Sequence, residues 1–182
     1  MRFKSTSCSA FLAALVLAFG LGSAVSYAAE RPDVWVTMTT KIMLMTTDGL
    51  STSDLNVDTV NGVVTLHGKV STQTEKAKAE QIARGNHGVK DVKNLLQVVP
   101  ESERKVVERS DESIKEGVEA AFRANRRVSE SGIKVASVNK GVVLLSGKSK
   151  TLADHLESVE VARAVRGVRG VSTEVEVEQA TL

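Results

Sequence analysis

The chain has 182 residues, 42% of them hydrophobic, and its 24 basic and 22 acidic residues balance once Arg2 and Lys4 are set aside. A formally neutral remainder excludes general attraction to nucleic acid or acidic surfaces and leaves that role to a local patch. Cys8 is the only cysteine and lies in the first 28 residues, so disulfides, thiolate metal sites and cysteine nucleophiles are excluded from the rest.

The first 28 residues have the composition of a cleavable secretory signal. A positive start is followed by an apolar run from Ala10 to Leu21 and by small residues up to Ala28. The run is shorter than the roughly 20 residues that a membrane-spanning helix needs. Cys8 lies before the run, so no lipid anchor is expected at the junction. We therefore expect export to a compartment outside the cytoplasm, cleavage after Ala28, and a mature chain without a transmembrane segment.

An internal repeat dominates the mature sequence. Residues 62–98 recur as residues 141–177, each displaced by 79 positions, and 13 of the 37 pairs are identical. Such self-similarity indicates the tandem duplication of one small domain. Glycines recur where a chain must turn, and we interpret six of them as structural turns: Gly62, Gly68, Gly88, Gly141, Gly147 and Gly167.

In the first unit the pattern predicts helix, strand, strand, helix and strand. Asp33 opens the first helix, which its threonines weaken. Asn61-Gly62 lies between two β-rich runs and predicts a tight hairpin, because both turn residues must accept positive φ. Gly68 ends the second strand, and Thr72 with Glu75 forms a capping box that opens the second helix.

The second unit repeats this order after a charged segment. Residues 100–110 are predicted to be a short exposed linker, and Asp111 to cap the next helix. The hairpin turn at Asn139–Gly141 carries one extra residue, which a loop tolerates. Thr151 opens the second helix. In the closing strand, residues 171–178 alternate between an apolar face and a polar face that we expect to meet water.

These elements predict an α+β fold made by tandem duplication of a small α-β-β-α-β sandwich, in which a three-stranded sheet packs on two helices. The predicted divisions are a signal peptide at 1–28, a first domain at 33–99, a linker at 100–110 and a second domain at 111–178. About 70 residues in each unit suffice for a small core.

A turn-and-strand pattern carries a family resemblance. In the first copy its residues are Val60, Asn61, Gly62, Val63, Val64, Leu66, Gly68, Lys69 and Val70, followed by Arg84 at a helix end and by Gly88, Val89 and Val92. Because both copies carry the pattern, the chain resembles the BON family, in its two-domain periplasmic form, over nearly all of the mature sequence.

The resemblance implies a three-stranded sheet on two helices and a role in the bacterial envelope. Members of this family are described as binding phospholipid surfaces, supporting outer-membrane integrity, or acting as periplasmic chaperones under osmotic stress. Lipid-anchored two-domain members carry an acceptor cysteine at the signal junction, and this chain does not. Constitutive membrane attachment is therefore not implied.

A trio of basic residues recurs between the repeats and is the candidate lipid-binding site. Three cations around a helix end can hold lipid phosphates. Cations at a helix C-terminus also satisfy the last carbonyl groups and the helix dipole, and the sequence alone favours this second interpretation. The residues are Arg84, His87 and Lys90 in the first copy and Arg163, Arg166 and Arg169 in the second.

The first helix offers a second candidate surface. Trp35, Met38 and Met45 can form an adaptable apolar surface for unfolded clients or lipid tails. Such residues more often fill a core, and that is the interpretation the sequence favours. Helical spacing puts Met38 and Met45 on one flank, which leaves a partly exposed stripe possible.

The sequence predicts neither an enzyme nor a metal site. His67, His87 and His155 have no histidine counterparts in the other repeat, and no metal-ligand spacing, calcium loop, phosphate loop or nucleophile elbow is present. We therefore expect no catalysis, no cofactor and no nucleic-acid partner. The leading hypothesis is reversible adsorption to anionic phospholipid. The alternatives are a periplasmic chaperone that shields apolar segments and an adaptor that binds other envelope proteins.

Overall fold

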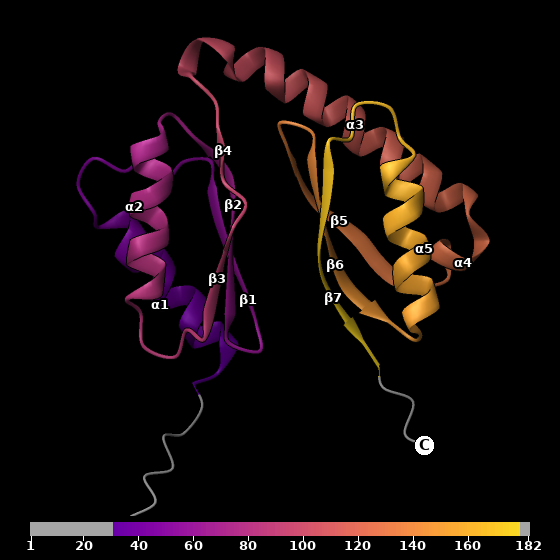
Figure 1. Cartoon of the computed structure of the whole chain (residues 1–182), viewed down its shortest axis with the longest axis horizontal. Helices are drawn as coiled ribbons and strands as arrows, with labels where there is room; N and C mark the ends of the chain where they lie inside the picture. The colour runs from indigo at the N-terminus through magenta and orange to yellow at the C-terminus, as the bar shows by residue number, and fades with distance from the viewer. Residues whose placement is uncertain (1–30, 179–182) are drawn as a thin grey trace, which may run out of the picture.

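A computed structural model describes residues 31–178 and contains two units side by side (Figure 1). The predicted signal peptide lies outside the described residues. The first unit contains α1 (Asp33–Met45), β1 (Leu55–Val60), β2 (Val63–Val70), α2 (Gln73–Arg84), β3 (Asp91–Asn94) and β4 (Gln97–Val98). The second contains α3 (Arg104–Ala124), α4 (Arg126–Ser129), β5 (Gly132–Asn139), β6 (Val142–Ser149), α5 (Leu152–Arg163) and β7 (Gly170–Val177), after a short 3-10 helix η1 (Glu101–Glu103).

Both units have the predicted α+β architecture. In the first, β1 pairs antiparallel with β2, and β3 and β4 pair parallel with β2. In the second, the order is β5-β6-β7 with the same directions. The helices cover the outer face of each sheet, so the two sheets face each other across the middle of the molecule (Figure 1). Each sheet encloses its own apolar core against its helices.

An aspartate near the start of each unit fixes the hairpin turn. Asp33 accepts hydrogen bonds from the backbone N–H groups of Asn61 and Gly62 at 2.7 and 2.8 Å. Asp111 does the same for Lys140 and Gly141, both at 2.9 Å. All four turn residues have positive φ, as a two-residue type I′ hairpin requires. The carboxylate therefore accepts hydrogen bonds from two turn amides that the backbone hydrogen bonds between the strands leave without a partner.

The extra residue of the second unit is not in this turn. Both hairpins have two-residue turns, and the β5–β6 pairing instead shifts between Val135 and Ser137. Ala136 is therefore a β-bulge, and the prediction of a longer turn was wrong. A bulge absorbs one residue in a strand without changing the pairing on either side of it.

The segment 100–110 is exposed over most of its length, and most of it is helical. Helix α3 starts at Arg104, so Asp111 lies inside the helix and does not cap it. The side chain of Arg104 is buried, and its guanidinium bonds the carboxylate of Asp54 and the hydroxyl of Ser71. Figure 1 shows α3 lying across the top of the molecule from the first unit to the second. The helix thus joins the units as well as covering the second sheet.

Further contacts hold the two units together. Lys69 Nζ lies 3.2 Å from Asp111 Oδ2, and the side chains are only 10% and 6% exposed. Lys140 Nζ donates to the carbonyl of Val98 at 3.0 Å. The polar face of β7 also lies toward the first unit, where Glu174 is half-buried. The expectation that this face meets water was therefore wrong in part.

Gly147 is predicted to be intolerant of a side chain. Its φ is 116°, and an added Cβ would lie 2.1 Å from the carbonyl oxygen of Gly132 on the paired strand. We expect Gly147→Ala to lower the free energy of unfolding by at least about 2 kcal/mol in urea denaturation. Gly170→Ala is the control, because a Cβ there meets nothing within 4 Å. Equal stability of the two variants would contradict the prediction that position 147 does not tolerate a side chain.

The Lys69–Asp111 pair is predicted to stabilise the docking of the units. Lys69→Met leaves Asp111 buried without its cation, and we expect the free energy of unfolding to fall by about 2–3 kcal/mol. The loss is not larger because the carboxylate keeps its hydrogen bonds from the two turn amides. The matched control is Lys148→Met at the equivalent position of the second repeat, where Lys148 is 69% exposed and 3.7 Å from Glu176. That change is expected to alter the unfolding free energy by about 0.5 kcal/mol or less. Losses of similar size would refute the role of the buried pair.

Candidate functional site

The first basic trio lies around the loop that follows α2, and its arginine is already paired. The guanidinium of Arg84 lies 3.0 Å from the carboxylate of Glu80 and 3.4 Å from that of Asp91. Hydrogen bonds from Asn94 and then from Arg84 lower the pKa of Glu80. His87 is exposed in the loop beyond. Arg84 therefore acts within the first unit as the charge partner of two carboxylates.

The third member of each trio packs on the hairpin turn. The backbone N–H of Lys90 donates to the carbonyl of Gly62 at 2.8 Å, and Arg169 bonds Gly141 in the same way at the same distance. A Cβ added to Gly62 would meet the Lys90 stem at 3.0 Å, and one added to Gly141 would meet Arg169 Cγ at 3.0 Å. These aliphatic stems thus cover the glycines, while the charged ends lie at the surface.

The second trio differs from the first in its charge partners. The positions that correspond to Glu80 and Asp91 are Val159 and Gly170, so the two carboxylates are missing from the second unit. The three arginines Arg163, Arg166 and Arg169 are all exposed. Over residues 31–178 the structure shows no ion pair to any of them. The second unit therefore presents the more available cations.

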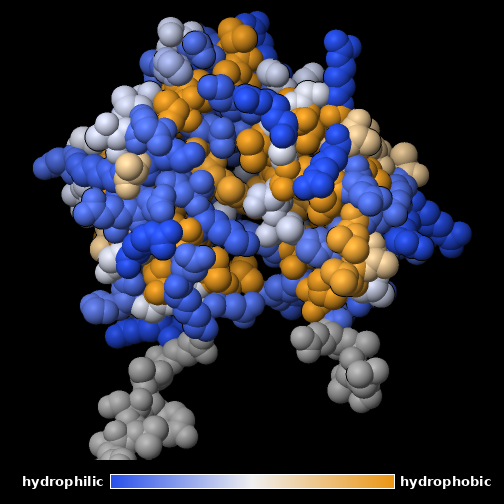
Figure 2. Space-filling view, viewed as in Figure 1, coloured by the Kyte–Doolittle hydropathy of each residue, from blue (hydrophilic) through white to orange (hydrophobic). Residues whose placement is uncertain are grey.

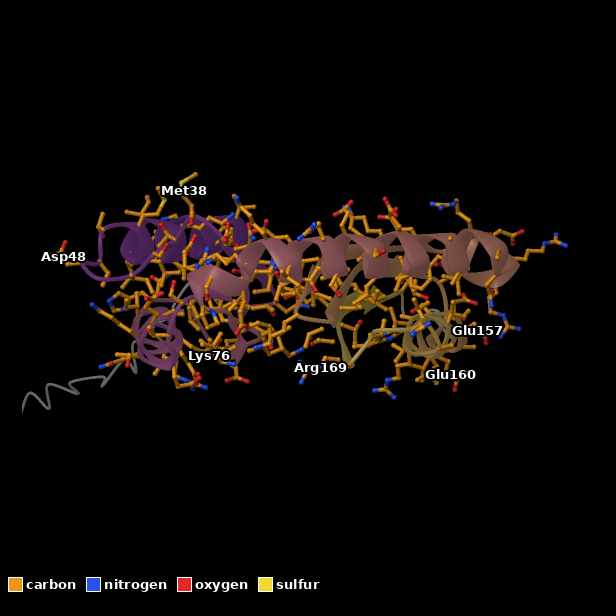
Figure 3. All side chains as sticks on the ribbon, turned by 90° about the horizontal axis from the view of Figure 1, so that it is seen from above. Met38, Asp48, Lys76, Glu157, Glu160 and Arg169 are labelled. Carbon is orange, nitrogen blue, oxygen red and sulfur yellow. The ribbon has the colours of Figure 1, made fainter. Side chains whose placement is uncertain are left out.

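The apolar residues of α1 lie on its exposed face. Val34, Met38, Ile42 and Met45 are 76%, 60%, 53% and 71% exposed, and we call these four the α1 stripe. In Figure 3, Met38 points away from the body of the protein. The interpretation that Met38 and Met45 fill the core was therefore wrong. Spacings of four and three residues align the stripe along one side of the helix.

Trp35 does not belong to the α1 stripe. It is partly buried against the first core, and the Arg31 guanidinium lies 4.1 Å from its ring centroid. The buried face of α1 instead includes Thr40, whose hydroxyl donates to the Val36 carbonyl at 2.8 Å and accepts from the Asn86 amide at 2.8 Å. The apolar pattern of the sequence did not predict which face of α1 is buried, because one of the core positions is occupied by a hydrogen-bonded threonine.

A groove runs between the α1 stripe and the second sheet. Its volume is ≈ 890 Å³, and Val34, Met38 and Ile42 form its apolar wall. The facing wall comes from β5, β6 and β7 and includes Val135, Ala136, Lys134, Lys148, Glu174 and Glu176. A second hollow of ≈ 500 Å³ lies between β2, β3 and β7. Figure 2 shows the surface hollowed along the seam between the units.

Sequence reasoning missed this groove because its walls come from different units. No motif contains both walls, and only the docking of the sheets brings them together. One clue was available, since an apolar i, i+4 pattern on α1 has no partner helix in the predicted fold. Another apolar pair, Leu152 and Leu156 on α5, is 59% and 55% exposed.

The remaining titratable residues form no metal centre within the described part of the chain. No group of three histidine, cysteine, aspartate or glutamate side chains is arranged to hold a metal ion in residues 31–178. His67 bonds Asp58 at 2.8 Å, and His155 bonds Thr173 at 2.9 Å. None of the helices described here is both long and apolar enough to cross a membrane.

The chain matches the BON domain family model twice, at residues 32–100 and 110–179. Osmotically-inducible protein Y of Escherichia coli K12 is 31% identical over 144 residues, which cover 79% of this chain and 71% of that protein. The 21 kDa hemolysin of Actinobacillus pleuropneumoniae is 32% identical over 119 residues, which cover 64% of this chain and 59% of that protein. Among solved structures, the C-terminal domain of CdsD from the type III secretion system of Chlamydia trachomatis matches with a TM-score of 0.31 and 14% identity, covering 81% of this chain and 67% of that one.

Proposed function

Because this chain belongs to the BON domain family, we propose that it is a non-catalytic stress protein of the bacterial periplasm whose second domain adsorbs reversibly to anionic phospholipid. The similarity to an osmotically inducible protein over most of the chain supports the stress role. The signal-like composition of the first 28 residues supports export. The exposed arginines of the second unit support the proposal of adsorption.

One observation carries the adsorption proposal. The second unit presents Arg163, Arg166 and Arg169 at the surface without the carboxylates that neutralise Arg84 in the first unit. Guanidinium groups bind phosphate oxygens in a bidentate manner. A basic side chain near an anionic leaflet contributes about 1 kcal/mol. Three such residues give an attraction that is local, salt-sensitive and weak enough to reverse.

Replacing all three arginines of the second trio by glutamine is predicted to reduce binding to anionic vesicles by about two orders of magnitude, since each contributes about 1 kcal/mol. Glutamine retains part of the stem that packs on the hairpin glycine. The matched control replaces Arg84, His87 and Lys90 by glutamine and is expected to bind like the parent. Co-sedimentation with anionic and neutral vesicles at low and high salt measures both. Undiminished binding of the second-trio variant would refute this site.

The α1 stripe supports a second candidate function, a chaperone that shields apolar segments of envelope proteins. Four exposed apolar side chains in a row, three of them on the wall of a groove, give a surface that two methionines make adaptable. Met38 and Arg169 lie on opposite sides of the molecule in Figure 3. A flat membrane therefore does not engage both surfaces at once, and the two functions are separable by mutation.

Met38→Gln with Ile42→Gln is predicted to abolish suppression of client aggregation, because it replaces two of the three apolar side chains that form the wall of the groove. Light scattering of reduced insulin at high salt, without lipid, measures this. Leu152→Gln with Leu156→Gln is the control, because these leucines have the same spacing and similar exposure but lie outside the groove. Absence of suppression by the parent protein at stoichiometric concentration would exclude this function. Equal losses in both variants would exclude the groove as its site.

A further inference from the structure

The seam between the two sheets encloses side chains that the core of the first unit does not use. Along β2, Val64 and Leu66 belong to that core, whereas Thr65, His67 and Lys69 alternate with them and point to the opposite face. These three are nevertheless only 1%, 6% and 8% exposed. The second unit covers them, so their burial depends on how closely the units are docked.

Two polar atoms in this seam have no hydrogen-bond partner within the described residues. His67 uses Nε2 to bond Asp58 at 2.8 Å, and its buried Nδ1 has no partner. The other atom is Oε1 of Glu174, which β7 carries into the seam from the second unit. A buried carboxylate oxygen without a donor disfavours the ionised form, whereas a protonated carboxyl group is cheaper to bury.

The groups that face Glu174 come from every strand of the first sheet that packs against it. Burial has the largest effect on the pKa of Glu174 and raises it. A hydrogen bond with Thr65 lowers this pKa in part, and the charge of Asp58 raises it. His67 on β2 and Lys93 on β3 lower it. The groove wall beside Glu174 also carries Lys41, Lys134, Lys148 and Glu176, and the Lys69–Asp111 pair lies farther along β2. The net direction for Glu174 is upward.

We propose that the seam is a pH-dependent clasp, closed when Glu174 carries a proton and loosened when it is ionised. A group whose pKa is higher in the docked state binds its proton more tightly there. Its contribution to docking is fully present below the undocked pKa and is lost as pH rises through the docked pKa. Docking through Glu174 therefore weakens from acidic toward neutral pH.

The Asp58–His67 pair works in the opposite sense and within the first unit alone. A hydrogen bond from His67 lowers the pKa of Asp58, so the stability that this pair gives is present above the unfolded pKa and is lost as pH falls through the folded one. The clasp is thus closed over an acidic range of pH. The lower limit of that range is the pH at which Asp58 begins to take up a proton and the first unit begins to lose its Asp58–His67 pair. Because Glu174 lines both hollows of the seam, its ionisation also sets how widely the groove opens.

Distances between the units test the clasp directly. Residues 29–182 contain no cysteine, so Gln81→Cys on α2 and Glu160→Cys on α5, both exposed, give one spin label on each unit. Double electron–electron resonance of the mature protein from about pH 5 to about pH 8, above the ordinary glutamate range, reports the distance distribution. We expect a longer-distance population that grows as pH rises. A single distribution that does not change with pH would overturn the proposal.

Three variants separate the clasp from a merely structural effect. Glu174→Gln keeps the shape without the charge and is expected to remain at the shorter distance over the whole range. Thr65→Val removes a bond that favours the ionised form, so the transition moves to higher pH. Glu176→Gln, two residues along the same strand face, is expected to titrate like the parent. If Glu174→Gln titrates like the parent, or if Glu176→Gln abolishes the transition, the assignment to Glu174 is wrong.

Discussion

The arrangement of the two units depends on the contacts that the carboxylate of Asp111 makes. It accepts hydrogen bonds from two turn amides of its own unit, and it faces the ammonium group of Lys69 from the other. A buried carboxylate is stable only when its lone pairs are used, and here backbone donors and a cation from another unit use them together. The position of the hairpin and the docking of the sheets are consequently linked through one side chain.

The equivalent aspartate in the first unit shows how the two copies diverged. Asp33 bonds the same two turn positions, but the repeat equivalent of Lys69 is Lys148, which is exposed and pairs weakly with Glu176. Both copies of the domain therefore keep the aspartate that holds the hairpin turn, and only the second copy also uses it for docking. Helix α3 extends this asymmetry, because its added first turns reach the first unit through Arg104.

Divergence also explains why the two candidate binding surfaces lie in different units. The first unit neutralises its helix-end arginine with two carboxylates and exposes the apolar side of α1. The second lacks those carboxylates and exposes three arginines, while α3 places Ile114, Val118 and Phe122 in its core. A tandem repeat can thus separate a charged surface from an apolar one without a change of fold. The groove and the seam between the units exist only because both copies are present.

The sequence by itself determined the duplication, the order of elements, the Asn61-Gly62 hairpin and the Thr72 and Thr151 caps, because turn chemistry and capping are local properties of a few neighbouring residues. Only the tertiary structure decided which faces are covered. It buried Thr40 and exposed Met38, moved the extra residue to Ala136, and made residues 104–110 helical. Burial depends on which distant segment packs against a face, and periodicity within one element does not contain that information.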